Sequence, residues 1–184
     1  DGQQLISASM PSFSGLEPHG RVIPRKTLDN WVFNAARKAG ATVLENVLVT
    51  GFEVEENGVK VVAQDAGGNR TFKARLLIGA DGTNSLIARK LRGYTPPTAN
   101  RIIGVRGYFE NVEGACDEAN MHFATDSFPG YCWLFPTSPT EANVGVGVLL
   151  ETTPKGNEPK ALLNRLIKED EGLKSRLKNA RLKQ

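Results

Sequence analysis

The amino-acid sequence predicts an α/β protein of the α+β kind, in which a small β-meander with helices precedes an antiparallel sheet. Apolar residues recur at helical spacing over residues 27–39 and again over 159–170. Between these two stretches, alternating runs are joined by Asn57-Gly58 and Gly67-Gly68, which are typical hairpin and turn dipeptides. Pro96 and Pro97 mark a boundary, and strand-like runs follow at about 101–110, 119–125, 130–136 and 142–150.

Size and composition are those of a globular protein. A chain of 184 residues can form one or two small domains with a core, and 40% of the residues are hydrophobic. The net charge of +3 is too small to indicate nucleic-acid binding, and no window reaches the ~18 apolar residues of a membrane helix. We therefore expect a cytoplasmic protein. Peripheral contact of the Lys/Arg-rich segment 174–183 with an anionic membrane is the alternative to a solvated helix face.

The sequence offers no pattern for a metal site or for a disulfide framework. The cysteines, Cys116 and Cys132, have no metal-ligand spacing, and the histidines, His19 and His122, are isolated from one another. We predict reduced cysteines and no bound metal.

The first 75 residues contain several predicted elements. Weak alternation in the first 20 residues predicts a strand near 3–9. The helix over 27–39 has Thr27 as its expected N-cap and Gly40 as its expected stop. Two further strands flank Asn57-Gly58, which favours a type I′ turn, and a third strand over 71–75 completes the meander.

A strand-to-helix junction at Asp81-Gly82 is the first candidate site. The apolar run Leu76–Ala80 predicts a buried strand, and residues 85–91 predict a short helix. The junction places a carboxylate, a glycine and a helix N-terminus at the carboxyl end of a strand, where α/β sheets bind cofactors that carry ribose and phosphate. Asp81 can accept hydrogen bonds from sugar hydroxyls, and Gly82 lets a ligand approach the main chain. An ordinary turn is the alternative, because Asp-Gly is a common turn dipeptide.

An aromatic strand is the second candidate site. Tyr131, Trp133 and Phe135 alternate and therefore project from one face of a strand. Gly145 and Gly147 alternate on the next strand, which leaves room for a flat or long apolar ligand. The alternative is an aromatic face that packs on the protein's own core.

These segments together resemble a known family. The order of Arg21–Asp29, a helix, a hairpin and Leu76–Lys90 resembles the middle of FAD-dependent oxidoreductases of the p-hydroxybenzoate hydroxylase-like superfamily. Arg89 follows Ser85 by four residues, as in the geranylgeranyl reductase branch. The run Tyr131-Cys-Trp-Leu-Phe-Pro136, followed after eight residues by Gly145-Val-Gly147, is similar to the Tyr-x-Trp-x-Phe-Pro…Gly-x-Gly signature of geranylgeranyl reductases. The resemblance spans roughly residues 20–150.

The resemblance implies a division of labour along the chain. Residues 1–95 would be a partial FAD-binding domain, with residues 1–20 as a strand beside the substrate, and residues 96–184 would be an antiparallel-sheet substrate domain with C-terminal helices. It implies FAD contacts from Arg25, the main chain at Val49, Asp81 and Gly82. It implies a substrate wall made of Tyr131, Trp133, Phe135, Pro136, Gly145 and Gly147.

The resemblance also implies a reaction, in which reduced flavin gives hydride to a carbon–carbon double bond of a prenyl or isoprenoid lipid, or of another apolar small molecule. NAD(P)H or a ferredoxin would supply the electrons, and the residues identify no catalytic group. The family's Gly-x-Gly-x-x-Gly loop and its later Gly-Asp motif do not occur here. We therefore expect an internal fragment or trimmed form that binds FAD weakly or not at all.

Two alternatives to this function follow from the same residues. The Asp81-Gly82 junction also occurs in FAD-dependent aromatic hydroxylases and other monooxygenases. A domain without the phosphate-binding loop can instead be a non-enzymatic module that binds an apolar ligand without flavin.

Overall fold

The computed structural model describes residues 5–16, 19–93, 101–151 and 158–183. The chain forms two compact units, one of Val32–Pro97 and one that combines Asp1–Trp31 with Thr98–Gln184. The boundary between Pro97 and Thr98 lies close to the expected division at residues 95 and 96, and the N-terminal segment groups with the sheet. The main-chain N–H of Arg25 donates to the hydroxyl of Tyr108 in the sheet, which ties this segment to its unit.

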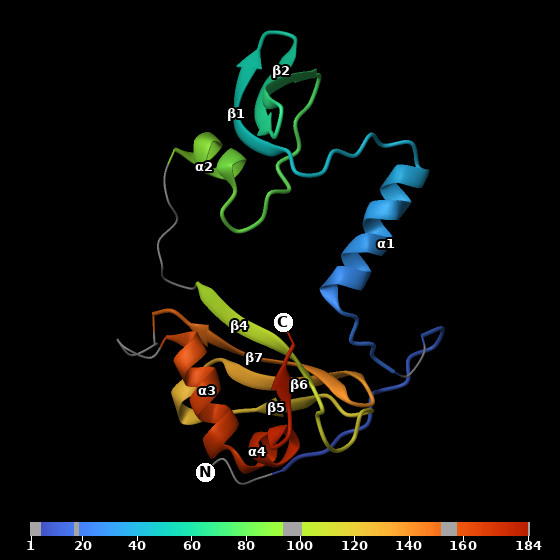
Figure 1. The fold of residues 1–184 in the computed structure, drawn as a ribbon, viewed down its shortest axis with the longest axis vertical. Helices are drawn as coiled ribbons and strands as arrows, with labels where there is room; N and C mark the ends of the chain where they lie inside the picture. The colour runs from blue at the N-terminus through green and yellow to red at the C-terminus, as the bar shows by residue number, and fades with distance from the viewer. Residues whose placement is uncertain (1–4, 17–18, 94–100, 152–157, 184) are drawn as a thin grey trace. The chain divides into compact units, whose positions relative to one another are not determined.

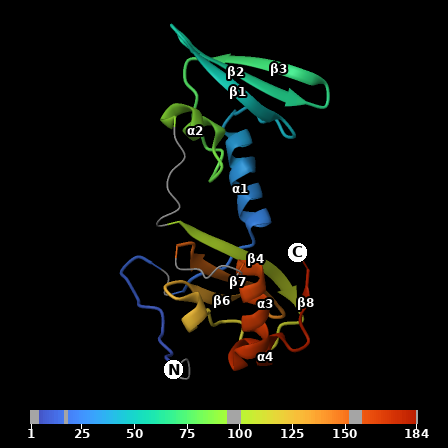
Figure 2. The ribbon, with the colours of Figure 1, turned by 90° about the vertical axis from the view of Figure 1, so that its left-hand side faces the viewer.

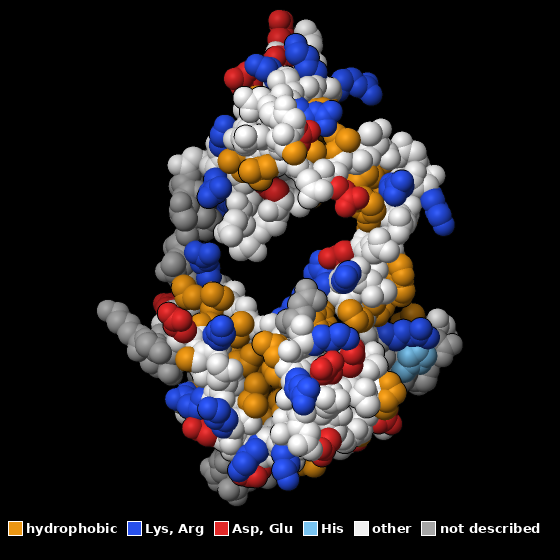
Figure 3. Space-filling model, viewed as in Figure 1, with side chains coloured by type: hydrophobic (Ala, Val, Ile, Leu, Met, Phe, Trp, Pro, Cys, Tyr) orange, Lys and Arg blue, Asp and Glu red, His pale blue; other side chains and the backbone are white. Residues whose placement is uncertain are grey.

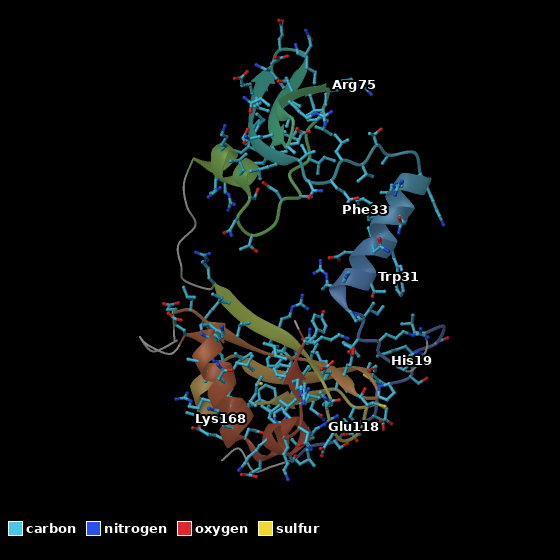
Figure 4. The ribbon with its side chains drawn as sticks, in the orientation of Figure 1. His19, Trp31, Phe33, Arg75, Glu118 and Lys168 are labelled. Atoms are coloured by element: carbon cyan, nitrogen blue, oxygen red, sulfur yellow. The ribbon has the colours of Figure 1, made fainter. Side chains whose placement is uncertain are left out.

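The first helix, α1 (Arg25–Lys38), begins two residues before the expected N-cap. It starts earlier because the N–H groups of Thr27 and Leu28 both donate to the carbonyl of Pro24. It ends as expected at Gly40, whose φ of +91° allows the N–H groups of residues 40 and 41 to bond the carbonyls of Arg37 and Ala36. Trp31 projects from the exposed apolar side of α1 (Figure 4).

The meander is an antiparallel sheet in the order β1-β2-β3, formed by β1 (Leu48–Glu55), β2 (Gly58–Asp65) and β3 (Gly68–Ala74). The turn between β1 and β2 differs from the predicted one, since Glu55 pairs with Gly58 and leaves Glu56 and Asn57 as the turn residues. Gly58 is required for a different reason, because a Cβ there would collide with the carbonyl oxygen of Ala74. The buried side chains of this sheet are Val59, Val61 and Ala63.

The predicted buried strand at Leu76–Ala80 does not form. Leu76 and Ile78 are 74% and 78% exposed, and no strand within the described residues pairs with this segment. A parallel-type strand is stable only when neighbours cover its edges and faces, so an apolar run alone does not make one. For the same reason the strand expected near residues 3–9 is absent from residues 5–16, the described part of that region. The short helix α2 (Leu86–Arg92) does follow Asp81-Gly82.

The larger sheet contains the four strands predicted after residue 100. These are β4 (Ile102–Glu110), β5 (Asn120–His122), β6 (Tyr131–Ser138) and β7 (Glu141–Leu149). A two-residue strand, β8 (Arg181–Leu182), was not predicted and pairs with the end of β4. All neighbours are antiparallel in the order β5-β6-β7-β4-β8, and a 3-10 turn, η1 (Thr125–Ser127), lies before β6.

Two helices cover one face of this sheet (Figures 1 and 2). The helix α3 (Pro159–Glu169) packs on β7 and β4, and α4 (Glu171–Leu177) packs on α3. Lys168 of α3 lies on its solvent side (Figure 4). The core between helices and sheet includes Cys132, Leu134, Val144, Val146, Leu162, Leu166 and Leu173. Because side chains alternate along each strand, the odd-numbered residues of β6 and β7 face away from this core.

Among the described residues, no helix is long and apolar enough to span a bilayer.

Candidate functional site

Three aromatic rings lie in a row along β6, on the side of the sheet away from α3 and α4. The ring centroids of Tyr131 and Trp133 are 6.0 Å apart, and those of Trp133 and Phe135 are 6.2 Å apart. Phe123 extends the row, with its centroid 5.9 Å from that of Tyr131. We call these four residues the aromatic face. The alternation in the sequence predicted its three members on β6 correctly as neighbours on one side of the strand.

Glycines lie beside this row on the neighbouring strands. Gly147 pairs with Tyr131, and Gly145 pairs with Trp133. Gly104 of β4 pairs with Gly147 and adds a third glycine that the sequence alone did not reveal, because its partner is about forty positions away. We call Gly104, Gly145 and Gly147 the glycine floor.

The indole of Trp133 fills part of the space above this floor. A Cβ at Gly145 would collide with the Trp133 ring, whereas a Cβ at Gly147 would lie 3.7 Å from it, an ordinary contact distance. The indole Nε1 donates to Asn143 Oδ1 at 2.7 Å, which fixes the orientation of the ring. The missing side chain at Gly145 therefore makes room for the Trp133 ring. The space left for a ligand lies over Gly147.

A pocket of about 600 Å³ occupies that end, a volume within the range of small-molecule sites. Pro129, whose peptide bond with Phe128 is cis, and Gly130 form one wall. The complete lining is Ile102, Gly104, Pro129, Gly130, Tyr131, Trp133, Gly147, Val148 and Leu149. We call it the apolar pocket, because none of these residues is charged. Apolar side chains (orange) reach the surface of the sheet unit between charged ones in Figure 3.

A second pocket of about 290 Å³ lies along the same aromatic row and has polar groups at one end. Its lining is Val22, Ile23, Arg25, Arg106, Tyr108, Tyr131, Trp133, Phe135 and Asn143. We call it the polar pocket. It shares Tyr131 and Trp133 with the apolar pocket, so a single row of rings borders both spaces.

Tyr108 is a polar group of the polar pocket whose hydroxyl has two hydrogen-bond donors as partners. Its hydroxyl oxygen accepts from the Arg25 main-chain N–H and from Arg106 Nη1, each at 3.2 Å. Burial favours the neutral phenol, but the Arg25 N–H, the Asn143 side chain and the Arg106 charge outweigh it and lower the pKa of Tyr108. Arg106, Tyr108 and Asn143 were not among the predicted site residues. Arg106 and Tyr108 alternate with Val105 and Phe109, which face the core, and this alternation is a signal for them in the sequence.

Arg25 lines the polar pocket, but its guanidinium is engaged with Asp29. The Nε–Oδ1 distance is 2.9 Å, and a second hydrogen bond joins Nη2 to Oδ2. This pair lies at i,i+4 spacing along α1. The contact of Arg25 with the sheet is therefore made by its main chain.

The Asp81-Gly82 junction lies in the other unit. The carboxylate of Asp81 accepts from Ser85 Oγ, from the N–H of Leu86 at 2.7 Å and from the N–H of Ile87 at 3.4 Å. These bonds, with that from Ser85 the strongest, lower the pKa of Asp81. Gly82 has a φ of +74° and open space around the position of a Cβ, so a ligand could approach its main chain. Val49 lies beside a bulge on β1, which is an edge strand.

Pro136 lies apart from the predicted wall. It shares the parity of Cys132 and Leu134, so it faces the opposite side of the sheet and lines neither pocket. The expectation that it joins the substrate wall is corrected, because alternation along a strand separates it from Phe135.

A cysteine, a histidine and an aspartate also meet on that opposite side. Cys132 pairs across the strands with His122, whose Nδ1 lies 3.0 Å from Asp170 Oδ1. Burial, with the nearby Asp170 charge, raises the pKa of Cys132 to about 12. A thiol that stays protonated is a poor nucleophile, which argues against Cys132 as a nucleophile. Within the described parts of the chain, no three His, Cys, Asp or Glu side chains are grouped to hold a metal.

Comparisons with known proteins identify relatives of this chain. Residues 101–182 match the family model of the geranylgeranyl reductase catalytic domain. A digeranylgeranylglycerophospholipid reductase 1 of Methanothermobacter thermautotrophicus is 31% identical over 74% of this chain and 35% of its own length. The corresponding reductase 1 of Methanopyrus kandleri is 34% identical over 76% of this chain and 39% of its own length. The chain thus spans somewhat more than a third of the curated relatives that it matches.

Solved structures share the fold. A geranylgeranyl bacteriochlorophyll reductase-like protein from Thermoplasma acidophilum superposes with a TM-score of 0.73, at 24% identity, over 87% of this chain and 40% of that one. The halogenase PltM in complex with phloroglucinol and FAD superposes with a TM-score of 0.70, at 18% identity, over 87% of this chain and 35% of that one. The family model and the curated relatives together show that this chain belongs to the geranylgeranyl reductase family.

Proposed function

We propose that the aromatic face and the apolar pocket hold an isoprenoid chain during flavin-dependent reduction of a carbon–carbon double bond. The observation that carries this proposal is the pocket of about 600 Å³ bordered by Tyr131, Trp133 and the glycine floor, with no charged residue in its lining. An isoprenoid offers only apolar contacts, and each buried CH₂ group contributes ~0.8 kcal/mol, so a five-carbon unit contributes about 3–4 kcal/mol. The names of the related reductases point to a geranylgeranyl-bearing phospholipid as the substrate class.

We propose FAD as the cofactor, and the Asp81-Gly82 junction fits part of it. The Asp81 carboxylate accepts hydrogen bonds from Ser85, Leu86, Ile87 and its own main-chain N–H, so a ligand hydroxyl would share or replace one of these bonds. The open space at Gly82 and the free edge of β1 near Val49 suit main-chain contacts. We also propose that Arg25 contacts the FAD, through its side chain or its main chain. When bound and reduced, FAD supplies hydride to the double bond.

The chain's own residues would orient the substrate and exclude water. The hydrogen bond from Trp133 to Asn143 holds the indole in place, and the row of rings shields the reacting carbons on one side. NAD(P)H or a ferredoxin remains the proposed electron source, and a peripheral membrane contact would give access to a lipid substrate.

The test uses the protein that carries this chain, with its flavin reduced anaerobically by dithionite so that the natural electron donor is not needed. Mixing with a geranylgeranyl phospholipid should oxidise the flavin, and Trp133→Ala should slow this reaction. Lys168→Ala, on the solvent side of α3, is the matched control and should leave the rate unchanged. No oxidation by any isoprenoid, together with oxygen-dependent turnover of a phenol, would refute the proposal in favour of an aromatic hydroxylase.

A further inference from the structure

A proton must accompany the hydride, because an alkene that accepts a hydride at one carbon needs a proton at the other. We propose that Tyr108 is the catalytic acid that delivers this proton. This inference rests on the proposed function and adds a residue role that the sequence signature does not contain.

The position of Tyr108 carries the inference. It lies on β4 two strands from the aromatic row, since Tyr108 pairs with Asn143 and Asn143 pairs with Phe135. Its side chain lines the polar pocket together with Tyr131, Trp133 and Phe135. A chain held along the row of rings would therefore have the Tyr108 hydroxyl within the same space.

The hydrogen bonds of Tyr108 suit an acid. Its oxygen accepts two N–H groups, from the Arg25 main chain and from Arg106, and both stabilise the phenolate that remains after proton transfer. The Arg25 N–H belongs to the first turn of the 14-residue helix α1, whose positive end adds to this stabilisation. The guanidinium of Arg106 also lies 5.5 Å from the centre of the Tyr108 ring. The lowered pKa of Tyr108 agrees with this arrangement.

Other groups near the pocket are less suited. A guanidinium such as that of Arg106 is too weak an acid to serve as a proton donor. Cys132 faces α3 and α4, and its pKa of about 12 makes its thiol a weak acid. Tyr131 lines both pockets, but within the described residues no hydrogen bond to its hydroxyl oxygen would stabilise a phenolate.

The step balances. The Tyr108 O–H bond breaks, and the electron pair of the alkene π bond forms the new C–H bond to that proton. Reduced FAD, when bound, would supply the hydride of the second C–H bond, so the alkene would gain two electrons and the flavin would lose two. The phenolate then regains a proton from water, and its pKa sets how readily it does so.

The first experiment measures the acid itself, independently of turnover. The protein that carries this chain is labelled with ¹³Cζ-tyrosine, and the resonance that disappears in Tyr108→Phe is followed with pH. We expect it to titrate below the ordinary tyrosine value of ~10 and to move upward in Arg106→Met. Titration at or above ~10, or no response to Arg106→Met, would overturn the proposal.

The second experiment follows oxidation of pre-reduced flavin by a geranylgeranyl lipid and, separately, by a quinone dye. Tyr108→Phe should slow oxidation by the lipid about 10²–10⁴-fold, the usual range for loss of a general acid, and leave oxidation by the dye unchanged. Lys168→Ala should change neither. Equal lipid rates for wild type and Tyr108→Phe would overturn the role of Tyr108 alone. Failure of the wild type with every isoprenoid, with the dye reaction intact, would remove the proposed function and this role with it.

Discussion

Gly145 and Gly147 lie two residues apart on β7, yet a methyl group meets different surroundings at each. At Gly145 it would press on the Trp133 ring, on the Val105 carbonyl oxygen at 2.6 Å and on Arg106 Cβ at 2.8 Å, whereas at Gly147 the nearest atom is 3.7 Å away. Main chain and packed rings cannot move aside cheaply. Glycine at position 145 is therefore required by the packing of the fold, whereas glycine at position 147 leaves space for a ligand.

Gly145→Ala should lower the free energy of unfolding by about 1–3 kcal/mol, the usual cost of overpacking a core. Gly147→Ala should change it by less than about 0.5 kcal/mol but weaken apolar ligands, because its methyl group would project into the apolar pocket. Denaturant unfolding and ligand titration of both variants check this. If both variants lost the same stability, the described packing of the Trp133 ring against Gly145 would be contradicted.

The two cysteines should differ in reactivity. Cys132 is fully buried with a pKa of about 12, so at pH 8 only about one molecule in 10⁴ carries the thiolate. Cys116 is exposed. A thiol reagent should label Cys116 in the folded protein and Cys132 only after denaturation, as mass spectrometry of the peptides will tell. Rapid labelling of Cys132 in Cys116→Ser under native conditions would contradict the described core.

Residue patterns predicted one side of the candidate site and not the other. Tyr131, Trp133 and Phe135 were identifiable because alternation along one strand fixes their common face. Tyr108 and Asn143 meet only through the register of β4 and β7, which a single sequence does not determine. Contacts between residues far apart in the sequence could therefore not be predicted.

At the scale of elements, α2 depends on a small network before its first turn. Ser85 Oγ accepts the N–H of Ala88 at 2.9 Å and donates to Asp81. Gly93, with a φ of +68°, closes the other end by donating to the carbonyl of Arg89. The Asp81 that the family resemblance assigns to a nucleotide is thus also a structural residue of its own helix.

Ser85→Ala should destabilise the meander unit by about 0.5–2 kcal/mol, the usual cost of losing an N-cap. It should also raise the pKa of Asp81 toward its ordinary value, because the Ser85 hydroxyl is the main cause of the lowering. Carboxyl-carbon NMR titration and thermal unfolding measure the two effects. Ser175→Ala on α4, whose hydroxyl donates to the Gly172 carbonyl, is the control.

The pH dependence of this network has a definite sign. A carboxyl whose pKa is lower in the folded than in the unfolded state stabilises the fold above its ordinary pKa and loses that contribution as the pH falls through the folded value. The difference in stability between wild type and Asp81→Asn should therefore shrink below about pH 4. A difference that grows on acidification would contradict the described hydrogen bonds.

Local signals predicted most of the elements. The helix over residues 159–169, the short helix after Asp81-Gly82 and four strands of the larger sheet all formed where periodicity and turn residues indicated. Leu76–Ala80 did not, because a strand needs a partner as well as an apolar pattern. The strand β8 escaped notice because a two-residue bridge at Arg181 and Leu182 leaves almost no periodicity to detect.

At the scale of the whole molecule, the two compact units have separate candidate roles. The meander unit carries the Asp81-Gly82 junction, and the sheet unit carries the aromatic face, the two pockets and Tyr108. One face of the larger sheet is committed to the helical core, which leaves the opposite face for a ligand. We propose that this opposite face receives the isoprenoid.

Photo-crosslinking can test whether the isoprenoid binds to the aromatic face. The protein that carries this chain is irradiated with a geranylgeranyl lipid bearing a diazirine in its chain, and the labelled residues are identified by mass spectrometry. We predict labels on Tyr131, Trp133 and the 128–130 loop that diminish when unlabelled geranylgeranyl lipid is added. Labels confined to α3 and α4, or labels that the unlabelled lipid does not displace, would contradict binding of the isoprenoid at the aromatic face.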